Sequence, residues 1–400
     1  MPMYLVLTIR SENVKFNLHI ENVKFSLRFY EQAEERKERG CIMAWKGGKI
    51  KALAEERKLK INKIAEELNV TRQAVNKWIN GQVPKGQHLV RLSTLLDVNP
   101  KYFFSDDIKN YVKLPLHRRR GVAKVTEEVE EKSFQLASSY EKLFKMTDPG
   151  LVQVLRVGTV NEQSAKNLAQ GLREISGIER NEPMDYDKAF ELQYKLGIVV
   201  VFRDFPDSIK SYAFYCKIHN HRVVFVNNAT NVLDLIFPLL HETIHAILDE
   251  KAQEISYNEE ENFCDLVASY VQFPDEYINM VSKIIDGLRK NVQINKIKFF
   301  SGENGHAIFG LVTRFPNLDY RDFAGADRNL KKDFPTIGDV LFDKKDPRDY
   351  IDILGKLTPH FIQIVTNQIG YVSNRTIGEW LGLESILDAE MAIKELKKKK

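Results

Sequence analysis

The sequence predicts a mainly helical protein with a small β-sheet, an α+β fold built from two or three domains. Apolar residues recur at helical spacing through most of the chain. Three short runs between residues 198 and 228 have the β-branched and aromatic character of strands: IVVVF, SYAFYCKI and HRVVFVNN. A chain of 400 residues is too long for one compact core. We therefore expect an all-helical domain, an α+β domain and a mostly helical C-terminal region.

The composition is that of a globular chain in a reducing compartment. Hydrophobic residues make up 43% and charged residues 28% of the sequence, which excludes wholesale disorder. The three cysteines, Cys41, Cys216 and Cys264, are odd in number and far apart, which argues against a disulfide framework or a thiolate zinc cluster. No apolar run approaches the ~20 residues of a membrane helix, and no signal peptide is recognisable. We expect a cytoplasmic protein without membrane contact.

Residues 1–42 differ from the rest of the chain. The segment ENVKFNL at 12–18 nearly repeats as ENVKFSL at 21–27, and a charged run follows. We interpret residues 1–42 as an atypical extension that need not belong to the native protein, with Met43 as a candidate start.

Basic charge is concentrated in one stretch of the chain. The net charge of the whole sequence is only +4, yet residues 49–104 carry eleven Lys or Arg against five Asp or Glu. This local excess of six positive charges favours a polyanionic partner, double-stranded DNA.

The same stretch has the pattern of short helices separated by tight breaks. Thr71 is a good N-cap for the third of them, which Gly81 and Pro84 end. The stretch resembles the helix-turn-helix domain of the Xre and phage-repressor family, and we place that domain at 43–112. The apolar positions that carry the resemblance include Ile64, Ala65, Val75 and Trp78.

This resemblance implies a set of DNA-reading side chains at the start of the third helix. They are Arg72, Gln73, Asn76 and Lys77. Arg and Lys can pair with guanine, and Asn and Gln with adenine, in the major groove. The alternative is a helical bundle that uses its basic face to bind protein.

Residues 113–160 are predicted to be linker and helices. The basic run HRRRG at 117–121 is either a solvated linker or a contact to phosphates beside the DNA-binding domain. A long amphipathic segment runs from Val125 to Phe144, and residues 125–177 are expected to form helices with a break at Asp148-Pro149.

The motif HETIH at residues 241–245 lies in a long apolar run, as expected of a buried helix. At 3.6 residues per turn, His241 and His245 lie one turn apart on one face, so both imidazoles can bind one Zn²⁺ ion. In such a motif Glu242 takes a proton from the attacking water and passes it to the leaving amine. The motif therefore predicts a zinc metalloendopeptidase.

A third metal ligand is expected in the following segment, NEEENFCDLVASYVQFP. Glu261 is preferred because its register against the apolar Cys264 and Val267 directs it inward, and Glu260 is the alternative. A His-His-Glu site leaves the fourth position for water, as in catalytic zinc sites. Asp265, four residues after Glu261, would accept the free N–H of one ligand histidine and hold its tautomer.

Residues 165–275 resemble the ImmA/IrrE family of metallopeptidases. The matching segments are LGIVVV, VVFVNN, HETIH and ENFCDLVASYVQFP. Cys264, Val267 and the pair Thr243-Ile244 depart from the usual residues of that family, while the chemical residues are intact. The resemblance implies a zincin-like domain, placed at 161–290, that cleaves a transcriptional repressor in a stress or mobile-element response.

Two functions stay open at this point. The first is a DNA-binding zinc endopeptidase acting on a protein substrate, as a monomer or a homodimer. The second is a transcriptional regulator or antitoxin-like protein whose peptidase domain serves as a sensor or protein-binding module. Glu242 favours the first, because a structural zinc site has no use for a general base.

Two further expectations concern substrate binding and the C-terminal region. The strand HRVVFVNN is expected to pair with an extended peptide next to the metal. Residues 291–400 are expected to be mostly helical, and the lysines at 397–400 to form a disordered, solvated tail.

Overall fold

The structure is a computed structural model, and its described residues fall into two compact units, residues 32–111 and the remainder of the chain. The described residues are 16–20, 23–29, 45–57, 59–96, 98, 103, 112–113, 126–149, 153–154, 159–248, 255–342 and 346–399. The basic run at 117–121 and the candidate start Met43 lie outside them. Each unit is described by itself.

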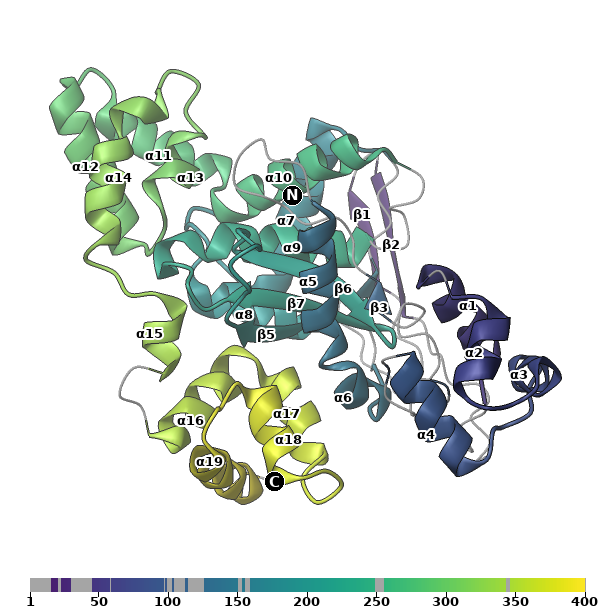
Figure 1. Ribbon diagram of the computed structural model, residues 1–400. Helices are drawn as coiled ribbons and strands as arrows, with labels where there is room; N and C mark the ends of the chain where they lie inside the picture. The colour runs from purple at the N-terminus through teal and green to yellow at the C-terminus, as the bar shows by residue number, and fades with distance from the viewer. Residues whose placement is uncertain are drawn as a thin grey trace. The chain divides into compact units, whose positions relative to one another are not determined.

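The smaller unit is a bundle of short helices, as the sequence predicted (Figure 1). They are α1 (Gly48–Glu56), α2 (Ile61–Glu67), α3 (Arg72–Ile79) and α4 (Gly86–Leu95). Thr71 caps α3, because its hydroxyl oxygen accepts a hydrogen bond from the backbone N–H of Ala74 at 3.1 Å. Asn69 adopts the left-handed conformation, φ 53°, that turns the chain from α2 to α3. The apolar side chains of Ile64, Val75 and Trp78 are buried in its core.

The larger unit is built on a four-stranded sheet of order β3-β6-β7-β5. Its strands are β3 (Val112–Lys113), β5 (Val199–Arg203), β6 (Ala213–Ile218) and β7 (His221–Asn227). Strand β7 runs parallel to β5 and antiparallel to β6. The three strands expected from the sequence are thus confirmed.

The prediction that the strand HRVVFVNN pairs with substrate is wrong. That strand is β7, and both of its edges are already hydrogen-bonded, to β6 and to β5. On its other side, β6 pairs with β3 at Lys217 and Ile218. Strand β7 is therefore an internal strand of the sheet.

Four helices that pack on one another carry and surround the HETIH motif. They are α7 (Glu162–Ser176), α8 (Tyr186–Lys195), α9 (Ile236–Leu248) and α10 (Tyr257–Gln272). Helix α9 follows a short 3₁₀ turn, η3 (Val232–Asp234), and packs on β6 and β7, and α10 packs on α7 and α9. Eleven of the thirteen residues of α9 are buried, so its polar side chains must find partners inside the protein.

Before these helices, the amphipathic segment expected from Val125 to Phe144 forms helices from Glu127 onward. The structure has two helices, α5 (Glu127–Ser138) and α6 (Glu141–Lys145), with a turn at Ser139 and Tyr140. Tyr140 is buried, and its hydroxyl donates a hydrogen bond to the Trp380 carbonyl at 3.2 Å. The turn between α5 and α6 thus coincides with a contact to a residue 240 positions away in the chain, which the local periodicity does not reveal.

Short strands β1 (Phe16–Ile20), β2 (Val23–Phe29) and β4 (Gln153–Val154) form a second sheet, of order β1-β2-β4.

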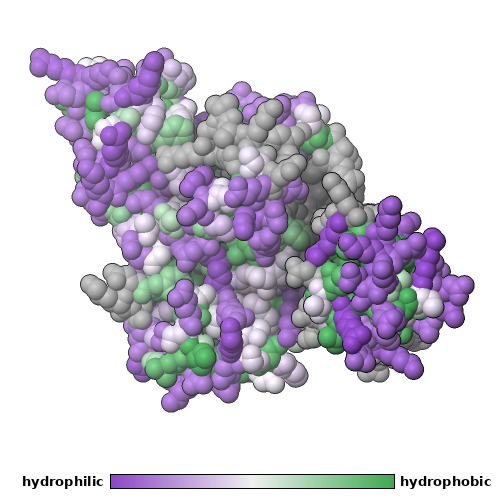
Figure 2. Space-filling view, viewed as in Figure 1, coloured by the Kyte–Doolittle hydropathy of each residue, from purple (hydrophilic) through white to green (hydrophobic). Residues whose placement is uncertain are grey.

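A second, smaller hydrophobic core follows α10. It is formed by α11 (Asp275–Ile285), α12 (Lys290–Glu303), α13 (Ile308–Val312), the 3₁₀ turn η4 (Tyr320–Asp322) and α14 (Ala324–Lys331). The visible surface of this region is largely hydrophilic (Figure 2).

The remaining helices return to the main core. They are α15 (Ile337–Phe342), α16 (Pro347–Leu357), α17 (Pro359–Asn367), α18 (Asn374–Leu381) and α19 (Ile386–Lys398). The expected disordered lysine tail is wrong as far as the chain is described, because α19 continues to Lys398, whose ammonium lies 2.8 Å from Glu395. No helix in the described part of the chain is long and apolar enough to cross a membrane.

His306 is expected to make the second core sensitive to acid. Burial lowers the pKa of His306 to about 4, below the ~6.5 of an exposed histidine. As the pH falls, His306 therefore takes up its proton in the unfolded chain before it does so in the folded protein. The free energy of unfolding that this group contributes above pH ~6.5 is lost progressively between pH ~6.5 and pH 4. We expect about 2 kcal/mol less stability at pH 5 than at pH 7 from this group. Thermal melting at both pH values should show a smaller loss in His306→Gln, and equal losses in the two proteins would contradict the assignment.

Candidate metal centre

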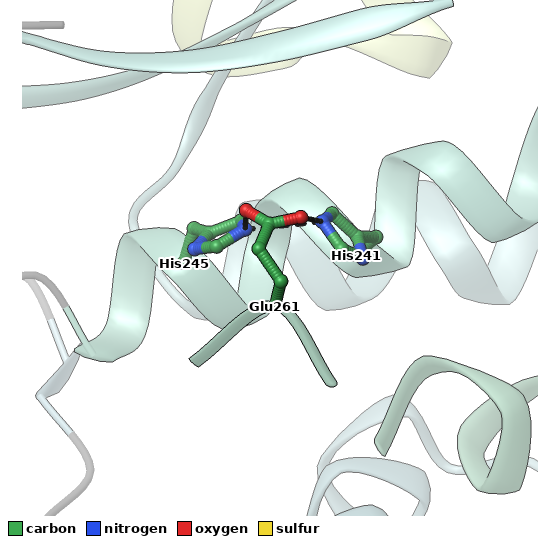
Figure 3. Close-up of side chains that lie close together, drawn as sticks. All are labelled: His241, His245 and Glu261. Carbon is green, nitrogen blue, oxygen red and sulfur yellow. Dashed lines mark hydrogen bonds and ion pairs between the residues drawn. The ribbon is translucent and has the colours of Figure 1, made fainter. Parts of the chain in front are cut away.

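His241 and His245 present their ring nitrogens to one point inside the larger unit. Both rings are buried on α9, and their Nε2 atoms lie 3.0 Å apart, as one helical turn allows. Glu261 reaches the same point from α10, with its carboxylate oxygens 3.1 Å from His245 Nε2 and 3.5 Å from His241 Nε2 (Figure 3). Two imidazoles and one carboxylate therefore converge as a group that could hold a metal ion.

The register of α10 decides which acid faces the histidines. Ser256 caps this helix in a capping box with Glu259, and the buried Cys264 and Val267 anchor it against the core. This register turns Glu261 toward the Nε2 atoms and Glu260 toward the Nδ1 atom of His245.

Each histidine also meets a carboxylate at its other nitrogen. Asp265 Oδ1 lies 2.8 Å from His241 Nδ1, and Glu260 Oε1 lies 2.7 Å from His245 Nδ1. The place of Glu260 was not foreseen, since the sequence offered it only as an alternative to Glu261. The sequence did contain a signal for this contact, because Glu260 and Asp265 lie on either side of Glu261 around the helix.

The donor set fits a cation. Carboxylates at both Nδ1 atoms favour ring protons there, which leaves bare lone pairs on both Nε2 atoms. Without a metal ion, protonated rings would supply the positive charge: burial by itself would raise the pKa of Glu261, but hydrogen bonds to and charges on His241 and His245 outweigh it and bring the pKa to about 2. Three electron-pair donors facing one another repel unless a positive charge lies between them, and two imidazoles with a carboxylate are suited to zinc.

Glu242 lies next to this group but faces the sheet. It is buried on α9, and its Oε2 atom accepts a hydrogen bond from the backbone N–H of Tyr215 in β6 at 2.8 Å. Burial raises the pKa of Glu242, an effect that the charges of His241 and His245 partly offset. Glu242 thus joins β6 to the helix that carries His241 and His245.

A cavity of about 380 Å³ opens beside Glu242, which forms part of its wall. A larger cavity of about 650 Å³ lies elsewhere in the same unit, against His221 and His360, and Glu242 does not line it. Of these two cavities, the smaller one is therefore next to the HETIH motif, which it meets through Glu242.

The predicted DNA-reading side chains share one exposed face of α3. Arg72, Gln73, Asn76 and Lys77 are all exposed. Val75 and Trp78, on the opposite face of the same helix, are buried. The structure leaves these four side chains accessible, with none of them needed for the core.

These features define a helix-turn-helix protein that also carries a metallopeptidase-like domain. Residues 50–103 match the family model described as helix-turn-helix, and residues 193–285 match the IrrE N-terminal-like domain. No curated protein and no solved structure matches the chain. The chain is therefore a DNA-binding regulator with a domain of the ImmA/IrrE peptidase family, and the architecture predicted from the sequence is confirmed.

Proposed function

We propose that this protein is a zinc-dependent endopeptidase that cleaves a protein substrate, a transcriptional repressor, and that its helix-turn-helix domain directs it to the genes concerned. The observation that carries the proposal is the convergence of His241, His245 and Glu261 with Glu242 beside them in a buried site. A site that only stabilises the fold would be closed by a fourth protein ligand and would need no adjacent base.

In this proposal each residue of the cluster has a separate task. His241, His245 and Glu261 hold Zn²⁺, which when bound supplies the Lewis acidity that polarises a peptide carbonyl. Asp265 and Glu260 keep the two imidazoles oriented through their Nδ1 atoms. Glu242 takes the proton of the attacking water on its carboxylate and delivers it to the leaving amine.

The burial of the site supports these separate roles of its residues. His241, Glu242 and His245 are all buried, so competing water is largely kept from the reacting groups. The cavity whose wall includes Glu242 can hold part of a peptide substrate. A peptide held there would lie against the general base.

A cleavage assay tests the proposal. The zinc-loaded full chain is incubated with repressor proteins encoded beside its own gene, in parallel with Glu242→Gln, and products are identified by mass spectrometry. Cleavage at one or a few sites by the wild type alone is expected. Intact substrates in both reactions would overturn the proposal and favour the sensor or protein-binding alternative.

DNA binding by α3 is expected to depend on sequence and on salt. Arg72→Ala should weaken binding to operator-region DNA by about 1–3 kcal/mol, or roughly 5- to 150-fold, if Arg72 contacts a base. Arg91→Ala, which removes the same charge from an exposed position on α4, is the matched control and should lose less. Fluorescence anisotropy at several salt concentrations should also show affinity falling steeply with salt. Equal losses in both variants, or no binding at low salt, would favour a protein partner for this face.

A further inference from the structure

The cavity beside Glu242 has walls from both hydrophobic cores of the larger unit. One wall is the first turn of α9 and the start of β6, including Phe237, Pro238 and Ala213. The facing wall is α13 and η4, including Phe309, Thr313 and Tyr320. Residues 307–320 lie beyond the span that matches the IrrE N-terminal-like domain, so this wall belongs to the chain's own C-terminal segment.

The walls are mainly apolar and partly aromatic. The rings of Phe309 and Tyr320 meet edge to face with centroids 4.9 Å apart. Phe237 lies one helical turn before His241, and the centroids of their rings are 6.4 Å apart. A volume of about 380 Å³ is at the small end of the ~300–1,000 Å³ of ligand pockets, which suits one side chain and its neighbouring backbone rather than a folded partner.

Two buried polar atoms at the cavity make no hydrogen bond within the described residues. They are Ser211 Oγ, before β6, and Gln272 Oε1, at the end of α10, and their side chains are 4% and 2% exposed. Leaving such buried atoms without a hydrogen-bond partner destabilises the protein. The backbone N–H and C=O groups of an extended peptide are partners of the right chemistry for both.

We infer that this cavity, lined by Phe237, Phe309 and Thr313 beside Glu242, receives a large apolar side chain of the substrate next to the bond that is cleaved. The inference rests on the proposed peptidase function and names its substrate class: peptides with a bulky aromatic or aliphatic residue at that position. Helix α13 is then the specificity-determining element, although it supplies none of the clustered residues.

The first test measures cleavage preference. The zinc-loaded full chain is given a mixed peptide library, and cleavage sites are read by mass spectrometry. The wild type should favour Phe, Tyr or Leu over Ala or Asp by about tenfold or more next to the cleaved bond. Thr313→Phe, which fills the cavity from an exposed position, should shift the preference toward small residues. Phe309→Ala should weaken it, whereas Phe299→Ala, an exposed aromatic outside the cavity, should leave it unchanged.

The second test needs no turnover. Binding of phenylalanine hydroxamate and alanine hydroxamate to the zinc-loaded protein is measured by calorimetry. The benzyl compound should bind roughly tenfold more tightly to the wild type and to Phe299→Ala, and this advantage should fall below about threefold in Thr313→Phe. The benzyl compound could bind more tightly to the wild type but not to Thr313→Phe, while the wild type cleaves no faster than Glu242→Gln. That result would overturn the peptidase function and leave the assignment of the cavity standing. Cleavage that does not depend on the residue next to the cleaved bond would overturn the assignment of the cavity. Tighter binding of the benzyl compound that persists in Thr313→Phe would overturn it as well.

Discussion

Glu242→Gln is expected to lower the rate of peptide cleavage by about 10²–10⁴-fold while the protein keeps its metal. The amide has the shape of the carboxylate but cannot take up the proton of the attacking water. Its carbonyl oxygen can still accept the backbone N–H of Tyr215, so the packing of α9 against β6 should survive. Cleavage rate, zinc content and melting temperature are measured on the same preparation.

Glu303→Gln is the matched control for this substitution, because it makes the same chemical change at an exposed position on α12. It should leave cleavage and zinc content at wild-type values. Retention of more than about a tenth of the wild-type rate by Glu242→Gln would show that another group acts as the base.

Glu261→Ala is expected to remove stoichiometric zinc, because two histidines alone rarely hold the ion. Glu260→Gln and Asp265→Asn should behave differently, since each of these acids contacts the outer nitrogen of one histidine. Each is expected to keep bound zinc but to lose about 10- to 100-fold in affinity, as the tautomer and orientation of the ring are no longer held. Competition against a chromophoric chelator measures all three variants on one scale.

The order of these losses matters more than their sizes. Glu303→Gln should again match the wild type, and the double variant His241→Ala/His245→Ala should bind no zinc. A greater loss of zinc from Glu260→Gln than from Glu261→Ala would mean that α10 is turned by about one residue from the register described. An unchanged affinity in Glu260→Gln would remove Glu260 from the site.

Several features follow from residues close together in the chain. Thr71, the left-handed Asn69 and the apolar Val75 and Trp78 are sufficient to predict α3, because caps, turns and helical periodicity act over a few residues. The spacing of His241 and His245 likewise predicts two rings on one face, since one turn of helix determines it. The three central strands were recognisable for the same local reason.

Other features depend on contacts between distant segments, and the local pattern could not supply them. The sequence of β7 was interpreted as a strand free to pair with a peptide, but its hydrogen bonding to both β5 and β6 makes it an internal strand. Glu260 was expected to matter only as a substitute for Glu261, until the packing of α10 on α9 brought it to His245 Nδ1. Helix α13 has no signature of a binding site in its sequence.

The sequence by itself therefore determined the helix-turn-helix motif, the three central strands and the presence of the HETIH residues whose side chains could bind a metal ion. Only the tertiary structure decided that β7 is an internal strand, that Glu260 contacts the outer nitrogen of His245, and that Phe309 and Thr313 line the cavity beside Glu242. The physical reason is that helix and turn preferences act within a few residues. Strand order, helix register and cavity walls come from burying apolar surface between segments that are far apart in the chain.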